Sequence, residues 1–239
     1  MANIIKLGSL YLDDCPADTE IVYNSGQAIR IGEAVPGKEI SWVVVNNMLI
    51  ADRCILTKIS WDNLKANGLV FGKEISIGGF RFTVRLIQVG AKEGALDEWD
   101  AALDTVGEDD SIWHWKDTYF WVQEPGKIAS YRAPRGYNSA RYWYWLGWSG
   151  RDAFLGFRPA LVPMNTDHLD EIRIGEQLRL WGGQSIVSGC LEEISDYEMV
   201  LSGWDGALSG NFGNRISNGR IVIDRGTVAG VQTKRKEAT

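Results

Sequence analysis

Residues that commonly bind metals or transfer protons are scarce in this sequence. Its 239 residues include two histidines, His114 and His168, and three cysteines, Cys15, Cys54 and Cys190. The cysteines are far apart and odd in number, so they form neither a metal-ligand spacing nor a complete disulfide framework. We therefore expect buried free thiols, no metal and no cofactor.

Long apolar runs and excess positive charge are also missing. No stretch approaches the roughly 18 uninterrupted apolar residues of a membrane span, and the first residues lack the pattern of a secretory signal. We expect no membrane span, and a location in a bacterial cytoplasm or in a phage particle assembled there. The formal net charge is −6. Because polyanion binding needs clustered Lys and Arg, and the one dense basic run is Lys234-Arg235-Lys236, nucleic acid is disfavoured as a partner.

Tryptophan and glycine are abundant, with 11 and 27 residues. Six of the tryptophans fall between Trp113 and Trp148. Within this aromatic segment, residues 132–155 are rich in Gly, Ser, Arg and aromatic residues, which predicts a long ordered loop instead of a helix or a regular strand. The composition is too aromatic for disorder.

The rest of the chain consists mainly of strand patterns. Residues 3–60 and 71–90 read as short strands, with hairpin turns at Asn46-Asn47 and Gly78-Gly79. One helix is expected at residues 93–106, where apolar residues recur at three- and four-residue spacing, and Gly107 is placed to end it. A buried strand is expected at residues 156–162, then a linker, then five short strands.

The last part of the aromatic segment resembles the end of a C-type-lectin-like domain. Residues 135–141 read RGYNSAR, an aromatic stretch follows, and residues 156–161 read GFRPAL. This version of the fold occurs in formylglycine-generating enzymes and in the variable proteins of diversity-generating retroelements. The resemblance covers about residues 40–162, and it implies that a Trp-rich core holds the loop before a final Gly-Phe-Arg strand.

The enzymes of this fold are a poor match. A formylglycine-generating enzyme would carry paired cysteines in the aromatic segment, which has none. The related sulfoxide-forming iron enzymes need a histidine cluster, and this chain has only two histidines. A serine hydrolase is disfavoured because no Gly-x-Ser-x-Gly nucleophile motif is present. We therefore expect no catalytic residues and no enzymatic activity. The variable proteins match better, and they imply a rigid scaffold with a loop that a retroelement diversifies.

The C-terminal residues resemble an Sm-like or Hfq-like small barrel. Residues 178–183 (LRLWGG), 194–201 (ISDYEMVL) and 221–231 (IVIDRGTVAGV) match its strands and turns. The RNA-binding members carry a Tyr-Lys-His patch where this sequence has Ile223-Asp224-Arg225. The resemblance therefore implies the barrel, and a possible homo-oligomer through it, without RNA binding.

These features predict an α+β fold. It comprises an N-terminal β segment at residues 1–40, a lectin-like ligand-binding domain with little regular structure at residues 41–163, and a small β-barrel at residues 169–234.

Tyr and Trp dominate binding surfaces because they offer large contact areas for few rotatable bonds. The expected ligand-binding residues are Tyr142, Tyr144, Trp145, Leu146, Trp148, Arg151 and Phe154. The rings expected in the core are Trp113, Trp115, Trp121 and Trp143, and Arg158 is expected to be structural.

The favoured function is a non-enzymatic phage or prophage protein that binds a protein or glycan on a cell surface. Three alternatives stay open. One is an Sm-like nucleic-acid binder, another is an enzyme on the lectin-like scaffold, and the third is a counter-defence protein that sequesters a host factor or a nucleotide.

Overall fold

The computed structural model describes residues 2–89, 97–124, 130–164 and 169–234. Strands account for 47% of the chain and helices for 12%. The α+β prediction is therefore wrong, and the protein is mostly β. Its α-helices are short: α1 (Trp61–Ala66), α2 (Glu98–Val106) and α3 (Asp110–Trp113). The expected helix residues 93–96, the linker residues 165–168 and the basic residues 235–236 lie outside the described residues.

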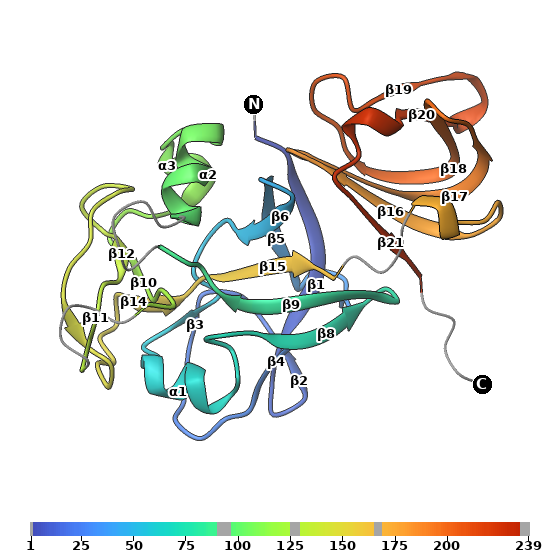
Figure 1. Cartoon of the computed structure of the whole chain (residues 1–239). Helices are drawn as coiled ribbons and strands as arrows, with labels where there is room; N and C mark the ends of the chain where they lie inside the picture. The colour runs from blue at the N-terminus through green and yellow to red at the C-terminus, as the bar shows by residue number, and fades with distance from the viewer. Residues whose placement is uncertain (1, 90–96, 125–129, 165–168, 235–239) are drawn as a thin grey trace.

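The largest sheet joins the N-terminal residues to the end of the aromatic segment (Figure 1). Its order is β2–β1–β5–β6–β15–β9–β8, and β4 also pairs with β1. Because β15 pairs with both β6 and β9, residues far apart in sequence form one sheet. The strands are β1 (Ile4–Leu12), β2 (Cys15–Ala17), β4 (Ile29–Gly32), β5 (Glu39–Val45), β6 (Met48–Ala51), β8 (Lys73–Ile77), β9 (Phe80–Leu86) and β15 (Pro159–Pro163).

Two turns and one helix end follow the local sequence signals. Asn46 and Asn47 have φ values of 50° and 61° between β5 and β6, and Gly78 and Gly79 have 62° and 81° between β8 and β9. Asparagine and glycine tolerate this left-handed region better than other residues. Gly107, with φ of 97°, follows the last residue of α2. The two hairpins and the helix end are confirmed.

A second sheet of very short strands carries the aromatic segment. Its order is β12–β10–β14–β7–β3, and β10–β14 and β3–β7 are parallel pairs. Gly156 lies at its centre, where an added Cβ would come within 2.6 Å of the Leu56 carbonyl oxygen. Only glycine fits there. The strands are β3 (Ile21–Val22), β7 (Leu56–Thr57), β10 (Tyr119–Phe120), β12 (Arg135–Gly136) and β14 (Leu155–Phe157).

The C-terminal part is a curled six-stranded sheet in the order β19–β20–β18–β17–β16–β21. Its last strand returns to pair with its first. Leucine, isoleucine and valine side chains from these strands form a separate core cluster. The strands are β16 (Gln177–Gly182), β17 (Ser185–Ile194), β18 (Glu198–Ala207), β19 (Gly213–Arg215), β20 (Ile221–Asp224) and β21 (Gly230–Thr233).

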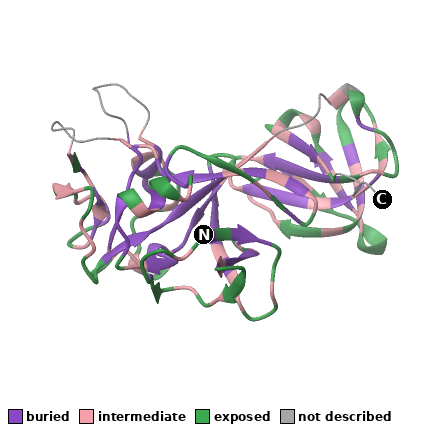
Figure 2. Cartoon of the chain, turned by 90° about the horizontal axis from the view of Figure 1, so that it is seen from below, coloured by how far each residue is buried: buried purple, intermediate pink, exposed green. Residues whose placement is uncertain are grey.

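The two parts share buried residues at their junction, and Figure 2 shows buried positions along the strands of both. Trp181 on β16 is fully buried, belongs to the main core cluster, and meets Phe82 of β9 edge-on at 6.2 Å between ring centroids. Its Nε1 donates to Oε1 of the fully buried Gln232 at 3.0 Å. The Gly183 N–H donates to Oδ1 of Asn47 at 2.6 Å. These contacts join the curled sheet firmly to the rest of the molecule.

The cysteines are free, as expected for unpaired thiols. Cys54 is buried, and burial raises the pKa of its thiol to about 11. Cys190 is half-buried and Cys15 is exposed. The prediction of buried thiols is therefore confirmed only for Cys54.

Candidate functional site

Residues 130–148 form a long β-hairpin, referred to below as the aromatic hairpin. β11 (Tyr131–Arg132) pairs antiparallel with β13 (Leu146–Gly147). The same register continues to the turn, where the Gly136 N–H donates to the Tyr142 carbonyl oxygen at 2.8 Å. The expected irregular loop therefore has a fixed strand register, and successive side chains of its second strand point to opposite faces.

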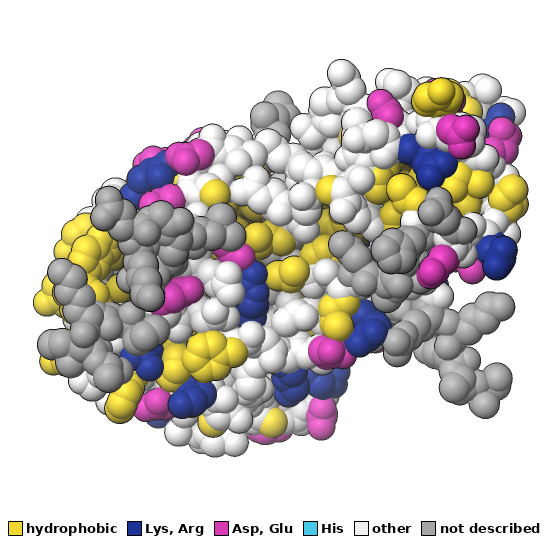
Figure 3. Space-filling model, viewed as in Figure 1, with side chains coloured by type: hydrophobic (Ala, Val, Ile, Leu, Met, Phe, Trp, Pro, Cys, Tyr) yellow, Lys and Arg dark blue, Asp and Glu magenta, His cyan; other side chains and the backbone are white. Residues whose placement is uncertain are grey.

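Both faces of this second strand are aromatic. On one face Tyr142 and Leu146 pack against the main core, while Tyr144 is 51% and Trp148 is 38% exposed. On the opposite face Trp143 is 45% exposed. Its ring meets Trp145 edge-on at 4.9 Å between centroids. The hairpin thus presents rings on two faces, and Figure 3 shows hydrophobic side chains gathered at this end of the molecule.

Tyr119 of β10 is the buried centre of a ring cluster. It stacks on Tyr137 at 4.8 Å between centroids, and Phe154 meets it edge-on at 6.0 Å. Tyr142 and Tyr144 lie within 6.2 and 6.5 Å of it. Burial and the neighbouring tyrosine hydroxyls raise the pKa of Tyr119 to about 12. The exposed Tyr144 and Phe154 are therefore supported from below by a packed ring.

A buried arginine positions Trp148. The Arg132 guanidinium carbon lies 4.0 Å from the Trp61 ring centroid and 5.3 Å from that of Trp148. Burial lowers the pKa of Arg132. The Trp148 carbonyl oxygen accepts a hydrogen bond from the Asp62 N–H at 3.4 Å. These contacts hold the end of the aromatic hairpin against α1.

The turn of the hairpin is fixed on α2 by charge. Arg135 Nη2 lies 2.5 Å from Asp97 Oδ2. Arg141 Nη2 lies 2.6 Å from Asp104 Oδ1, and its Nε lies 2.6 Å from Glu108 Oε1. Hydrogen bonds to these acids raise the pKa of Arg141. Since the pairs connect the turn to both ends of α2, the aromatic rings are presented on a rigid frame.

Arg158 of the Gly-Phe-Arg motif is structural, as the sequence predicted. It is fully buried, and its Nη2 donates to the carbonyl oxygens of Trp113 and His114 at 2.5 and 3.2 Å. Its guanidinium carbon lies 5.1 Å from the Trp99 ring centroid and 4.7 Å from that of Phe120. Burial lowers its pKa. Arg158 thus caps the C-terminal end of α3 and joins it to the second sheet.

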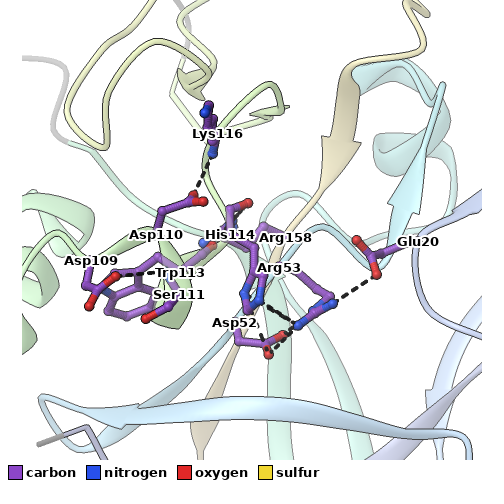
Figure 4. Close-up of polar contacts among 10 residues, drawn as sticks. All are labelled: Glu20, Asp52, Arg53, Asp109, Asp110, Ser111, Trp113, His114, Lys116 and Arg158. Carbon is purple, nitrogen blue, oxygen red and sulfur yellow. Dashed lines mark hydrogen bonds and ion pairs between the residues drawn. The ribbon is translucent and has the colours of Figure 1, made fainter.

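His114 lies in a polar cluster at the end of α3 (Figure 4). Its Nε2 is 2.9 Å from Arg53 Nη2, and Arg53 also pairs with Glu20 at 3.0 Å and with Asp52 at 3.1 Å. The imidazole therefore faces a guanidinium that two carboxylates hold. In the hydrogen bonds of the described chain, the His114 ring contacts Arg53 and no hydroxyl or thiol that it could activate.

The predicted ligand-binding residues differ in how far they are exposed. Tyr144, Trp148 and Phe154 are exposed, whereas Tyr142, Trp145 and Leu146 are half-buried. Arg151 is half-buried, and its Nη2 donates to the Tyr23 carbonyl oxygen at 3.2 Å, which fixes the loop after the hairpin.

The predicted core tryptophans also differ among themselves. Trp113 and Trp121 are fully buried, which confirms them as core, and Trp115 is half-buried. Trp143 was expected in the core and is instead exposed, because it lies on the hairpin face that points away from Tyr142. Tyr131, at 41% exposure, was missed. Had residues 130–148 been interpreted as two strands, the alternation of side chains between opposite faces would have indicated that Trp143 does not share the face of Tyr142.

Comparison of the chain with protein-family models, curated proteins and solved structures gives no match. Among the described residues, no group of three or more His, Cys, Asp or Glu is arranged to hold a metal ion. No helix in the described ranges is long and apolar enough to cross a bilayer. The function therefore has to be inferred from the side chains themselves.

Proposed function

We propose that this chain is a non-enzymatic binding protein whose ligand, a protein or glycan on a cell surface, contacts the aromatic hairpin. One observation carries the proposal: five partly exposed aromatic rings gather on and beside a rigid hairpin. They are Tyr131, Trp143, Tyr144, Trp148 and Phe154, with exposures of 38–51%.

The amount of exposed ring surface suits recognition. A large aromatic side chain has about 200 Å² to bury, so five rings at these exposures offer about 400 Å². That is about half of what one partner contributes to a standard protein interface, and it is ample for stacking on sugar rings. This surface is divided between the two faces of the hairpin, and exposed aromatic rings gathered at one end of a molecule favour an interaction site there.

The rigidity of the frame also supports binding. A ligand that meets ordered rings loses less conformational entropy than one that must order a loop. The ion pairs of Arg135 and Arg141 with α2, and the stacking of Arg132 between Trp61 and Trp148, order the hairpin before any ligand arrives.

The proposal includes diversification of this surface by a retroelement. Trp143 and Tyr144 are the most exposed rings of the hairpin, so exchanging them leaves the main core intact. Deep sequencing of the gene in a natural population tests this part separately. Substitutions concentrated at residues 142–155 support it, and a uniform segment rejects diversification while leaving a binder of fixed specificity.

Binding itself is tested with labelled protein on intact bacterial cells and on a glycan array. The variant Trp143→Ser/Tyr144→Ser should lose at least tenfold in affinity. Tyr197→Ser is the matched control, because Tyr197 is 80% exposed in the turn between β17 and β18 of the curled sheet. Protease or glycosidase treatment of the cells identifies the ligand class. Equal binding by wild type and the double variant would contradict the proposal.

A further inference from the structure

A second site lies at the junction between β1 and the curled sheet. A cavity of about 330 Å³ is lined there by Lys6 and its neighbours on β1 and by residues of β16, β17 and β18. Arg179, Ser188 and Asp205 are directly paired across these three adjacent strands, so they form one polar row along the cavity. Ile186 adds an apolar wall.

Arg179 is a buried cation that forms no salt bridge with any carboxylate among the described residues. Its residue is only 9% exposed, and its guanidinium carbon lies 4.2 Å from the Phe80 ring centroid. Its Nε donates to Ser188 Oγ at 2.8 Å, while Nη1 has no hydrogen-bond partner in the described chain. Burial lowers the pKa of this guanidinium to about 10, and the charge of Asp205 opposes that effect. Buried arginines are usually paired with a carboxylate, whereas within the described ranges Asp205 acts on Arg179 only through its charge and forms no ion pair with it.

The charges around the cavity define the ligand. Lys6 and Arg179 contribute two positive charges and Asp205 one negative charge, which leaves one net positive charge. A doubly charged phosphate would face repulsion from Asp205, whereas a single carboxylate balances the site. Asp205 Oδ1 accepts the N–H of Gly206 at 2.8 Å, and its remaining lone pairs can accept a further donor.

We infer that this cavity binds a small monocarboxylate that also carries a hydrogen-bond donor, such as an α-hydroxy acid. The carboxylate lies between the Arg179 and Lys6 side chains, and the donor group faces Asp205. A volume of about 330 Å³ accommodates a ligand of this size. The site is independent of the aromatic hairpin, which lies at the opposite end of the large sheet (Figure 1).

The test is thermal unfolding of the full chain with lactate, glycine, acetate, phosphate or chloride at matched ionic strength. Lactate should raise Tm by several degrees, because a ligand that binds only the folded state stabilises it. Acetate, which has no donor group, and glycine, which has no net charge, should give less, and phosphate or chloride no more than the salt control. Equal shifts for all five compounds would overturn the inference, since they would show ionic screening alone.

Variants separate the site from general stability. Arg179→Met keeps an apolar stem against Phe80 and should abolish the lactate-dependent shift. Arg215→Met is the matched control, because the Arg215 guanidinium carbon also stacks on an aromatic ring, 4.9 Å from the Trp204 centroid, but it does not line this cavity. Lys6 is exposed at the rim, so Lys6→Met should fold even if Arg179→Met does not, and it should weaken binding at least threefold. A full shift retained in Lys6→Met would overturn the assignment.

Discussion

The substitution Trp181→Ala should separate the unfolding of the curled sheet from that of the rest of the chain. Trp181 belongs to the curled sheet by sequence, but its ring is fully buried in the main core. Because the two parts share this ring, wild-type protein should unfold in one cooperative transition. Removing the ring deletes the largest apolar contact at the junction, so the variant should unfold in two transitions.

The magnitude follows from the buried surface. A fully buried tryptophan hides about 150–250 Å², which corresponds to about 4–6 kcal/mol at about 25 cal/mol per Å². Measured losses for Trp→Ala in cores are about 3–5 kcal/mol. The Nε1 hydrogen bond to Gln232 is also lost, and Gln232 keeps a buried acceptor without this donor. At about 2–4 °C per kcal/mol for a chain of this size, a loss of about 3–5 kcal/mol should lower Tm by about 6–20 °C.

Scanning calorimetry and urea unfolding followed by fluorescence and circular dichroism check the result. Trp204→Ala is the matched control, since Trp204 is a half-buried tryptophan of the same curled sheet that packs on its own core. The control should keep a single transition with a smaller loss. Two separate transitions in wild-type protein, or a loss below about 1 kcal/mol in Trp181→Ala, would refute the shared-core reasoning.

Three further predictions concern the ring cluster under the aromatic hairpin, the attachment of α2 to β9, and the turn of the hairpin. The pKa of Tyr119 is raised from 10 to about 12, so the neutral hydroxyl stabilises the fold fully below pH 10, and this stabilisation is lost as the pH rises toward 12. In urea unfolding between pH 10 and 12, the free energy of unfolding should therefore fall less in Tyr119→Phe than in wild type. Arg85 Nη2 lies 2.6 Å from Glu98 Oε1. Glu98→Ala leaves the buried guanidinium without this carboxylate, so the free energy of unfolding in the same assay should fall by about 3–5 kcal/mol. In Gly136→Ala, a Cβ would lie 2.6 Å from the Thr118 carbonyl oxygen at a φ of 99°; unfolding free energy should fall by at least about 1–3 kcal/mol, and cell binding should weaken. Unchanged stability in Glu98→Ala or Gly136→Ala, or a Tyr119→Phe profile identical to wild type, would contradict the corresponding contact.

Part of the candidate site could be predicted from composition. The concentration of Trp and Tyr in one segment indicated where exposed rings would gather, and such rings supply a large contact area. The exposure of individual rings was harder to predict. Tyr142 and Trp143 are neighbours of similar type, yet one packs on the core and the other is exposed. Only the pairing of β11 with β13 decides which face each ring occupies.

By itself, the sequence determined the features that depend on a few neighbouring residues. The asparagine turn at residues 46–47, the glycine turn at 78–79 and the end of α2 at Gly107 follow from local φ preferences. Tertiary structure decided the rest. Strands of two residues, such as β10 and β12, have no local pattern and form only because separate segments pair. The burial of Trp181 and Arg179 likewise arises where the large sheet meets the curled sheet, because their aromatic neighbours Phe82 and Phe80 lie more than 90 residues away in the chain.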